Sequence, residues 1–247
     1  MPDSLFGSDS ESEDESDAQA LRAPIQLASS SPPPIDGLYF FPGALPVELQ
    51  NELTEALSAD VWRNHSNQVM LFDSPTRSSL PSYLQPLLDL LPAILEPLPA
   101  MLKSSIFDSP RPRQAILNLY FPGQGISPHV DLPTRYEDGI VGISLLGSTV
   151  MDFCPSIHPS SSPPSSRRQA YSLRLRPGDV YVLSGPARWQ CEHGIAYREE
   201  DWVADEEGNP MKVRRGIRMS ITLRRMKQGA ELIGMDPGDG PVEGLGG

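Results

Sequence analysis

The sequence predicts an α+β protein with a single domain whose core is a β-sandwich or a β-barrel. Two leucine-rich segments with helical spacing lie within residues 46–98, and about seven short β-rich runs separated by turns follow residue 113. Helical segments followed by a series of strands are typical of α+β folds, and many short strands favour a sandwich or barrel. Both ends of the chain are poor in large apolar residues, which leaves one central domain.

The two helices are predicted from the spacing of their leucines. Residues 46–62 predict a helix in which Pro46 takes the first helical position. The leucines on its apolar face are Leu49, Leu53 and Leu57. Residues 78–98 predict a second helix, interrupted at Pro92. We expect both helices to pack against a sheet.

The strands are predicted from short runs rich in β-branched and aromatic residues. They cover residues 114–121, 139–146, 148–153, 170–176, 178–184, 189–195 and 216–225. Residues 155–168 are rich in proline and serine and predict a flexible loop between two strands. The charged segment 198–216 is interpreted as a hairpin near the entrance of the site.

The domain is expected to cover residues 36–227, between two disordered ends. Residues 1–35 are an acidic, serine-rich tract followed by a Pro/Ser linker, and residues 228–247 are glycine-rich and acidic. Such segments bury too little apolar surface to offset the entropy of ordering. An acidic tail of this kind solvates the chain or binds a protein partner, and its Ser-Asp/Glu repeats suit phosphorylation.

The net charge of −12 is concentrated at the two ends of the chain. Residues 1–17 hold seven acidic residues and residues 228–247 hold four, and neither segment contains Lys or Arg. The remaining 21 acidic residues are balanced by the 20 Lys and Arg of the chain. A nearly neutral domain does not exclude binding to nucleic acid, which requires a local basic surface rather than a basic chain.

The two cysteines indicate a reducing compartment. Cys154 and Cys191 belong to no CxxC pair and are too few for a disulfide framework. The N-terminus is acidic where a signal peptide is basic and then apolar. The leucine-rich segment 83–102 is interrupted by Asp89, Glu96 and several prolines, so no membrane span is expected. We therefore expect a soluble protein of the cytoplasm or nucleus.

The segment PGQGISPHVD, residues 122–131, contains a possible metal site. In an extended chain His129 and Asp131 point to the same side, although this pair also suits a capped turn. His65 and His158 lie in polar segments, whereas His193 follows an apolar run. Two histidines and one carboxylate form the facial triad of non-haem Fe(II) oxygenases, which leaves positions open for a 2-oxo acid and O2. The alternative is a structural histidine at a strand end.

The last predicted strand, residues 216–225, alternates apolar and polar residues. Its apolar face holds Ile217, Met219, Ile221 and Leu223, and its polar face holds Arg218, Ser220, Thr222 and Arg224. The two arginines are about 20 Å apart along an extended strand, and their side chains leave a gap suited to a dicarboxylate. Asn118 and Tyr120 share one face of an earlier strand. A half-buried edge strand with a solvated polar face is the alternative.

These motifs together resemble the AlkB family of Fe(II)/2-oxoglutarate dioxygenases. The resemblance rests on Asn118 and Tyr120, PGQGISPHVD, GPARWQCEHGI and RMSITLR, and covers about residues 113–227. It implies iron ligation by His129, Asp131 and His193. The residues it implies for 2-oxoglutarate are Asn118, Tyr120, Arg218, Ser220 and Arg224, with Arg218 at the distal carboxylate and Arg224 near the carboxylate that chelates iron. The implied fold is a double-stranded β-helix, or jelly-roll, with N-terminal helices packed on the sheet.

Within this family the sequence is similar to the branch that hydroxylates the modified wobble uridine of transfer RNA. The expected function is hydroxylation or oxidative demethylation of a modified nucleobase, with RNA favoured over DNA. Pro133 stands where the bacterial repair enzyme has an aspartate that meets the alkylated base, which disfavours repair of methylated adenine in the bacterial manner. A protein side chain or a small molecule is an alternative substrate, and a non-catalytic interaction module is an alternative role.

Basic residues outside these motifs are candidates for phosphate contacts if they share one face; scattered solubilising charge is the alternative. They are Arg111, Arg113, Arg167, Arg168, Arg174, Arg176, Lys212, Arg214, Arg215, Arg225 and Lys227. Cys191 is expected to be a buried apolar side chain rather than a ligand. Trp189 and Trp202 are expected in the core.

Overall fold

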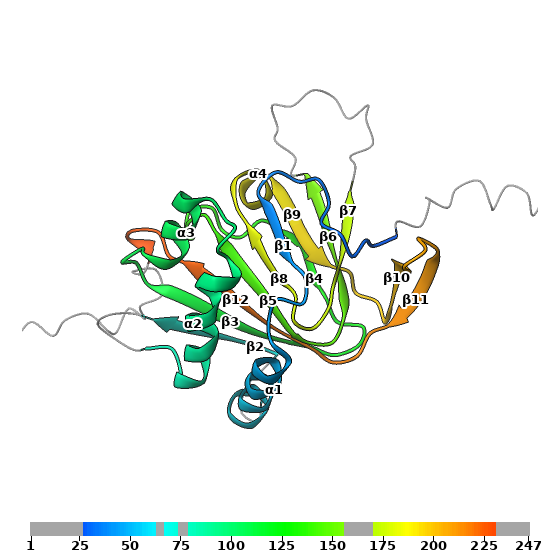
Figure 1. The fold of residues 1–247 in the computed structure, drawn as a ribbon, viewed down its shortest axis with the longest axis horizontal. Coiled ribbons are helices and arrows are strands. Elements are labelled where there is room, and N and C mark those ends of the chain that lie inside the picture. The colour runs from blue at the N-terminus through cyan, green and yellow to red at the C-terminus, as the bar shows by residue number, and fades with distance from the viewer. Residues whose placement is uncertain (1–26, 63–66, 74–78, 156–169, 231–247) are drawn as a thin grey trace, which may run out of the picture.

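A computed structural model describes residues 27–62, 67–73, 79–155 and 170–230 (Figure 1). Apart from its first residue, which ends a strand, the predicted loop 155–168 lies outside the described residues, as do most of the two predicted disordered ends. Within the described part of the chain, none of the helices has the length and apolarity needed to cross a membrane.

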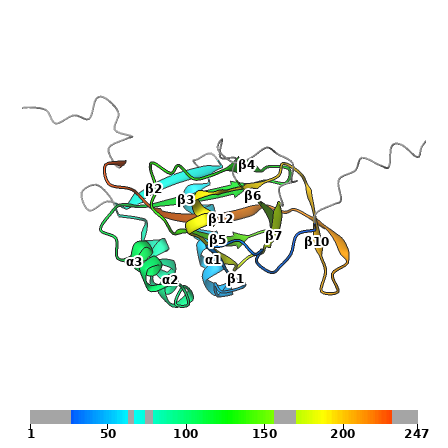
Figure 2. The ribbon, with the colours of Figure 1, turned by 90° about the horizontal axis from the view of Figure 1, so that it is seen from above.

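The core of the protein is a jelly-roll of two antiparallel sheets, as predicted (Figure 2). The larger sheet has the order β1 (Leu38–Phe41), β8 (Val180–Leu183), β5 (Ile140–Leu146), β12 (Arg218–Arg225), β3 (Arg113–Tyr120) and β2 (Gln68–Asp73). The smaller sheet has the order β4 (Ile126–His129), β9 (Cys191–Ile195), β6 (Thr149–Pro155) and β7 (Tyr171–Leu175). All seven predicted strands are present. The sequence did not predict β1, β2 and β4 because these strands are short or only partly buried.

The helices cover one face of the larger sheet (Figures 1 and 2). They are α1 (Val47–Ala56), which continues as a π-helical turn (Leu57–Val61), α2 (Gln85–Ile94), which follows a 3-10 turn (Ser82–Leu84), and α3 (Ala100–Phe107). Leucines of α1 and α2 share one buried cluster with β3, β5, β8 and β12. The prediction that the N-terminal helices pack on a sheet is thus confirmed.

Three details of the helices differ from the prediction. Pro46 precedes α1 as its N-cap residue rather than occupying the first helical position. Pro92 lies inside α2, near its end, and the helix continues to Ile94. The sequence did not predict α3, because a helix of eight residues with only two buried apolar side chains has too short a repeat to recognise.

A second buried cluster lies between the two sheets. It joins Phe153 and Leu175 of the smaller sheet to Ile140, Tyr181 and Leu183 of the larger one. Short helix α4 (Gly185–Trp189) follows β8 and leads into β9. Side chains from both sheets also line one cavity, which combines charged, polar and apolar residues. The space between the two sheets therefore contains an apolar cluster and this cavity.

The predicted charged hairpin is present as β10 (Glu200–Ala204) and β11 (Pro210–Arg214). Arg215 closes the base of the hairpin, because its Nε and Nη2 atoms each donate to Asp201 at 2.7 Å. Asp201 also accepts a hydrogen bond from the backbone N–H of Val150 on β6, at 3.1 Å, which joins the hairpin to the domain. Segment 27–30 adds two parallel bridges, from Ala28 to Val203 and from Ser29 to Leu173. The base of the hairpin is therefore tied to the chain on both sides.

Candidate active site

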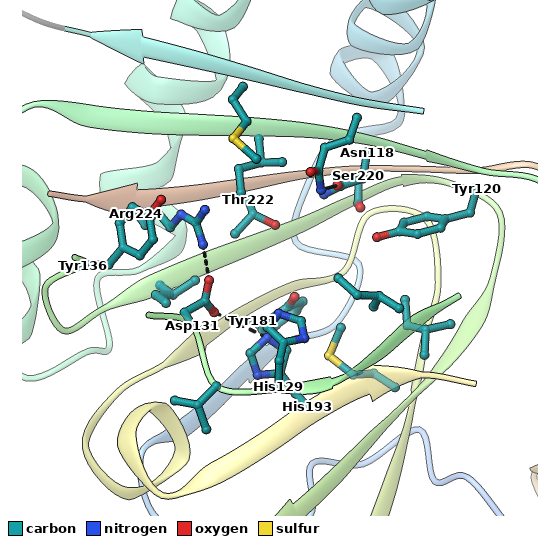
Figure 3. A pocket seen from close by; sticks show the side chains of 18 of the residues that line it. Asn118, Tyr120, His129, Asp131, Tyr136, Tyr181, His193, Ser220, Thr222 and Arg224 are labelled. Carbon is teal, nitrogen blue, oxygen red and sulfur yellow. Dashed lines mark hydrogen bonds and ion pairs between the residues drawn. The ribbon is translucent and has the colours of Figure 1, made fainter. Parts of the chain in front are cut away.

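The structure brings His129, Asp131 and His193 together beside strands β4 and β9 of the smaller sheet, where all three line the cavity (Figure 3). His129 ends β4 and pairs directly with His193 on β9, and the centroids of the two rings are 4.6 Å apart. Nε2 of His193 lies 3.5 Å from Oδ2 of Asp131. The potential ligand atoms of the three residues all lie within 4.8 Å of one another, which is the arrangement of a facial triad.

Burial prepares the His193 ring to act as a neutral ligand, and a hydrogen bond orients the His129 ring. Burial lowers the pKa of His193 to about 4, and the neighbouring Asp131 only partly opposes this effect. Nδ1 of His129 lies 2.9 Å from the carbonyl oxygen of Ser127. A hydrogen bond donated by Nδ1 to this carbonyl leaves Nε2 as the lone-pair donor for a metal ion.

Asp131 is held from both its side chain and its backbone. Nη1 of Arg224 forms an ion pair with Oδ1 of Asp131, and Nε of Arg224 donates to Oε1 of Gln114 at 2.7 Å. Nη1 of the fully buried Arg188 donates to the Asp131 carbonyl oxygen at 2.8 Å. The guanidinium of Arg224 also lies over the Tyr136 ring, 3.6 Å from its centroid. These contacts orient the carboxylate toward His193.

Arg218 lies at the other end of the site with unpaired donors. It begins β12, is 4% exposed, and donates from Nη2 to Oγ of Ser144 at 3.2 Å. Its Nε and Nη1 atoms are buried and have no hydrogen-bond partner among the described residues. Unpaired donors on a buried cation are costly, and a carboxylate is the ligand that fits a guanidinium. This end of the site therefore suits a carboxylate of 2-oxoglutarate.

One cavity of about 330 Å³ joins the two ends of the site. All eight residues implied by the AlkB resemblance line it: Asn118, Tyr120, His129, Asp131, His193, Arg218, Ser220 and Arg224. Ser220 pairs with Asn118 across β12 and β3, and burial raises the pKa of the Tyr120 phenol. The predicted alternation of β12 is also present, with Met219, Ile221 and Leu223 buried on the opposite face. Ile217 differs, because it precedes the strand and is exposed.

Four further residues contribute to the site without having been assigned a role there from the sequence. Gln114 and Tyr181 lie in apolar segments that predict only core packing, and Tyr136 lies in a charged segment without a motif. Arg188 belongs to the GPARWQCEHGI motif, and its position there was the one signal that could have identified it. Which backbone carbonyl such an arginine contacts depends on long-range packing.

Several other predicted roles are changed by the structure. Arg215 is bound to Asp201, and Arg225 donates to three backbone carbonyls at the end of α3 and beyond, so neither side chain is available for phosphate. His65, His158, Arg167 and Arg168 lie outside the described residues. Cys191 is buried in the core, as predicted, and burial raises the pKa of its thiol to about 11. Trp189 and Trp202 are only half-buried, and both lie against cations.

The jelly-roll and the His-Asp-His site define a non-haem Fe(II) oxygenase that uses a 2-oxo acid. Residues 73–224 match the 2OG-Fe(II) oxygenase superfamily, and the chain belongs to that superfamily. The domain thus has the fold and the potential metal ligands of the Fe(II)- and 2-oxoglutarate-dependent dioxygenases, a class of enzymes that takes O2 as a second cosubstrate.

Two relatives agree with the resemblance to AlkB proteins. The chain is 33% identical to tRNA (carboxymethyluridine(34)-5-O)-methyltransferase ALKBH8 of Macaca fascicularis over 129 residues, which are 48% of this chain and 18% of that protein. It is 28% identical to the alkylated DNA repair protein ALKBH8 homolog of Arabidopsis thaliana over 215 residues, which are 78% of this chain and 59% of that protein. The match thus spans less than two thirds of either relative.

A solved structure agrees with the fold. A Pseudomonas putida prolyl-4-hydroxylase superposes with a TM-score of 0.50 and 11% sequence identity, and the match covers 78% of this chain and 94% of that chain. At this level of identity the likeness concerns the jelly-roll alone.

Proposed function

We propose that this dioxygenase hydroxylates or oxidatively demethylates a modified nucleobase, with RNA as the favoured nucleic acid. The observation that carries the oxygenase chemistry is the His-Asp-His site beside the unpaired donors of Arg218. The choice of a nucleobase is supported by the similarity to ALKBH8 proteins, one named for a modified uridine of transfer RNA and one for repair of alkylated DNA.

In this proposal the residues of the cavity divide into two groups. His129, Asp131 and His193 hold Fe(II), which together with 2-oxoglutarate and O2 supplies the oxidation of a C–H bond to an alcohol. The residues for 2-oxoglutarate are Asn118, Tyr120, Arg218, Ser220 and Arg224. Of these, Arg218 binds the distal carboxylate, and Arg224 additionally keeps Asp131 in the orientation that ligation requires.

The entrance of the cavity suits a flat and largely uncharged group. Met70 and Leu132 line the cavity and remain 51% and 55% exposed. The ring of Tyr136 covers the guanidinium of Arg224, whose charge is already paired with Asp131. Pro133, two residues after Asp131, has neither a side-chain acceptor nor a backbone donor. A nucleobase would therefore be held by apolar contact and stacking, after leaving any duplex.

The product depends on the carbon that is oxidised. If this carbon is bound to nitrogen, the hydroxylated group leaves as formaldehyde and the base is demethylated. If it is bound to carbon, a stable alcohol remains. Both outcomes use the same residues, so the substrate alone decides between them.

The test is mass spectrometry of nucleosides after incubation of total RNA, or of alkylated DNA, with the full chain, Fe(II), ascorbate and 2-oxoglutarate. We expect one nucleoside to gain an oxygen atom or to lose a methyl group, and the Asp131→Ala variant to produce neither change. Consumption of 2-oxoglutarate that is stimulated by a methylated protein peptide, but by no nucleic acid, would contradict the proposal and favour a protein substrate.

A further inference from the structure

The ring of Tyr181 occupies space that is open because the facing residue, Gly142, has no side chain. It lies on β8, is 7% exposed, and its ring lies over Gly142 on the neighbouring strand β5. A Cβ atom added at Gly142 would lie 2.1 Å from Cζ and 2.5 Å from the hydroxyl oxygen of Tyr181. Gly142 is not among the glycines with positive φ, so the strand conformation does not require glycine there. The glycine is needed for the tyrosine ring.

The ring extends from β8 across β5 toward the polar face of β12. Gly142 pairs with Tyr181 on one side and with Thr222 on the other. Side chains of alternate residues in a strand point to the same face, so Ser144 lies beside Gly142 on this face, and Ser144 accepts the hydrogen bond from Arg218. The phenol of Tyr181 and the guanidinium of Arg218 are therefore neighbours across β5. Figure 3 shows Tyr181 among the side chains that line the cavity.

The hydroxyl of Tyr181 forms no hydrogen bond to another residue in the described part of the chain, and Tyr181 lines the cavity although only 7% of the residue is exposed. Burial raises the pKa of this phenol, and the nearby charge of Arg218 only partly opposes the effect. The hydroxyl thus remains a donor. Arg218 carries two further unpaired donors. Because Tyr181 and Arg218 line the same cavity, one carboxylate bound there would accept hydrogen bonds from both residues.

We propose that Tyr181 donates a hydrogen bond to the carboxylate of 2-oxoglutarate that Arg218 binds. Tyr181 is then a cosubstrate-binding residue in addition to those implied by the AlkB resemblance, and Gly142 is the residue that admits it. The inference rests on the proposed role of Arg218 at the distal carboxylate. It does not depend on which substrate is oxidised.

The test compares two 2-oxo acids bound to the anaerobic Fe(II) protein of full length. 2-Oxopentanoate has the same carbon chain as 2-oxoglutarate but a methyl group in place of the distal carboxylate. Binding of each acid is followed by the visible charge-transfer absorbance of the Fe(II) complex. We expect Tyr181→Phe to raise the Kd of 2-oxoglutarate about tenfold, which is typical of a lost hydrogen bond to a charged group. The Kd of 2-oxopentanoate should change by less than about twofold, because it lacks the acceptor.

Two further variants complete the experiment. Tyr39→Phe removes a hydroxyl from β1, the strand next to β8, and Tyr39 packs on the helical side of the sheet, so binding should not change. Gly142→Ala should displace the Tyr181 ring and reproduce the loss for 2-oxoglutarate.

The possible outcomes separate this proposal from the ones on which it rests. Unchanged binding in Tyr181→Phe, or an equal loss for both acids, would overturn the role of Tyr181 while leaving the cosubstrate site intact. A wild-type protein that bound Fe(II) but gave no absorbance with 2-oxoglutarate would overturn the cosubstrate site as well. Because the titration contains no oxidised substrate, a failure of the nucleobase proposal would not affect it.

Discussion

Arg224 and Asp131 form an ion pair inside the cavity, although 93 residues separate them in the chain. Both side chains are nearly buried, with 9% and 6% of their surface exposed. The second oxygen of Asp131 faces Nε2 of His193 at 3.5 Å. One oxygen of the Asp131 carboxylate therefore pairs with the buried guanidinium of Arg224, and the other oxygen faces the metal site.

This relationship predicts a metal-dependent stability for Arg224→Met. In the metal-free variant Asp131 stays buried without its partner, which costs about 3–5 kcal/mol of unfolding free energy. Bound Fe(II) supplies the missing positive charge, so Fe(II) should stabilise the variant more than it stabilises the wild type. Urea unfolding under anaerobic conditions, with and without Fe(II), measures both gains. Equal gains in the two proteins would contradict the prediction.

The unpaired donors of Arg218 predict that this residue binds 2-oxoglutarate but lowers the stability of the protein when no cosubstrate is bound. Arg218→Met keeps most of the volume and removes a buried cation, so the metal-free variant should unfold at an equal or higher urea concentration. Its Kd for 2-oxoglutarate should rise by roughly 10- to 100-fold, as expected for lost charge-assisted bonds. Arg225→Met is the matched control: its guanidinium has three carbonyl partners, so the substitution should lower stability. A large loss of stability in Arg218→Met would show that its donors are paired.

Arg188 is predicted to act as a positioning residue for Asp131. Arg188→Lys keeps the positive charge but cannot reproduce the contacts of a guanidinium with the carbonyls of Asp131 and Tyr136. We expect the Kd for Fe(II) to rise about tenfold, as is usual when a group that orients a metal ligand is changed. Equilibrium dialysis under anaerobic conditions measures this Kd. Arg225→Lys is the control: it should lower the stability of the protein without changing the Kd for Fe(II). An equal rise of this Kd in both variants would assign Arg188 a purely structural role.

The pKa of His193 predicts how the stability of the metal-free protein depends on pH. In the unfolded chain this imidazole has its ordinary pKa of 6.5, and burial lowers the pKa to about 4 in the folded protein. Between these values the unfolded state binds a proton that the folded state does not, so the unfolding free energy falls as the pH decreases from 6.5 toward 4. The contribution of His193 to the unfolding free energy is fully present above pH 6.5 and amounts to at most about 3 kcal/mol.

Urea unfolding of the wild type and of His193→Gln across this pH range isolates the contribution, because glutamine does not titrate. The wild type should lose more stability than the variant on acidification. Parallel curves for the two proteins would show that the pKa of His193 is the same in the folded and unfolded states.

Local patterns in the sequence predicted much of the fold. The period-two alternation of residues 218–224 identified both faces of β12, since a strand that is buried on one side and lines a polar cavity on the other must alternate. The leucines of α1 and α2 likewise identified helices that pack on a sheet. Strand β4 was not predicted, because it contains a proline and is only partly buried, and its position depends on pairing with β9.

The candidate site divides in the same way between local sequence and long-range structure. The two-residue spacing of His129 and Asp131 by itself determined that they share one side of an extended chain, and the AlkB resemblance named six further residues that line the cavity. Only the tertiary structure decided that His193 faces His129, that Arg224 pairs with Asp131, and that Arg218 and Tyr181 keep unpaired donors. Strand spacing is a property of the local backbone, whereas burial and hydrogen-bond partners depend on segments that meet only after the whole chain has folded.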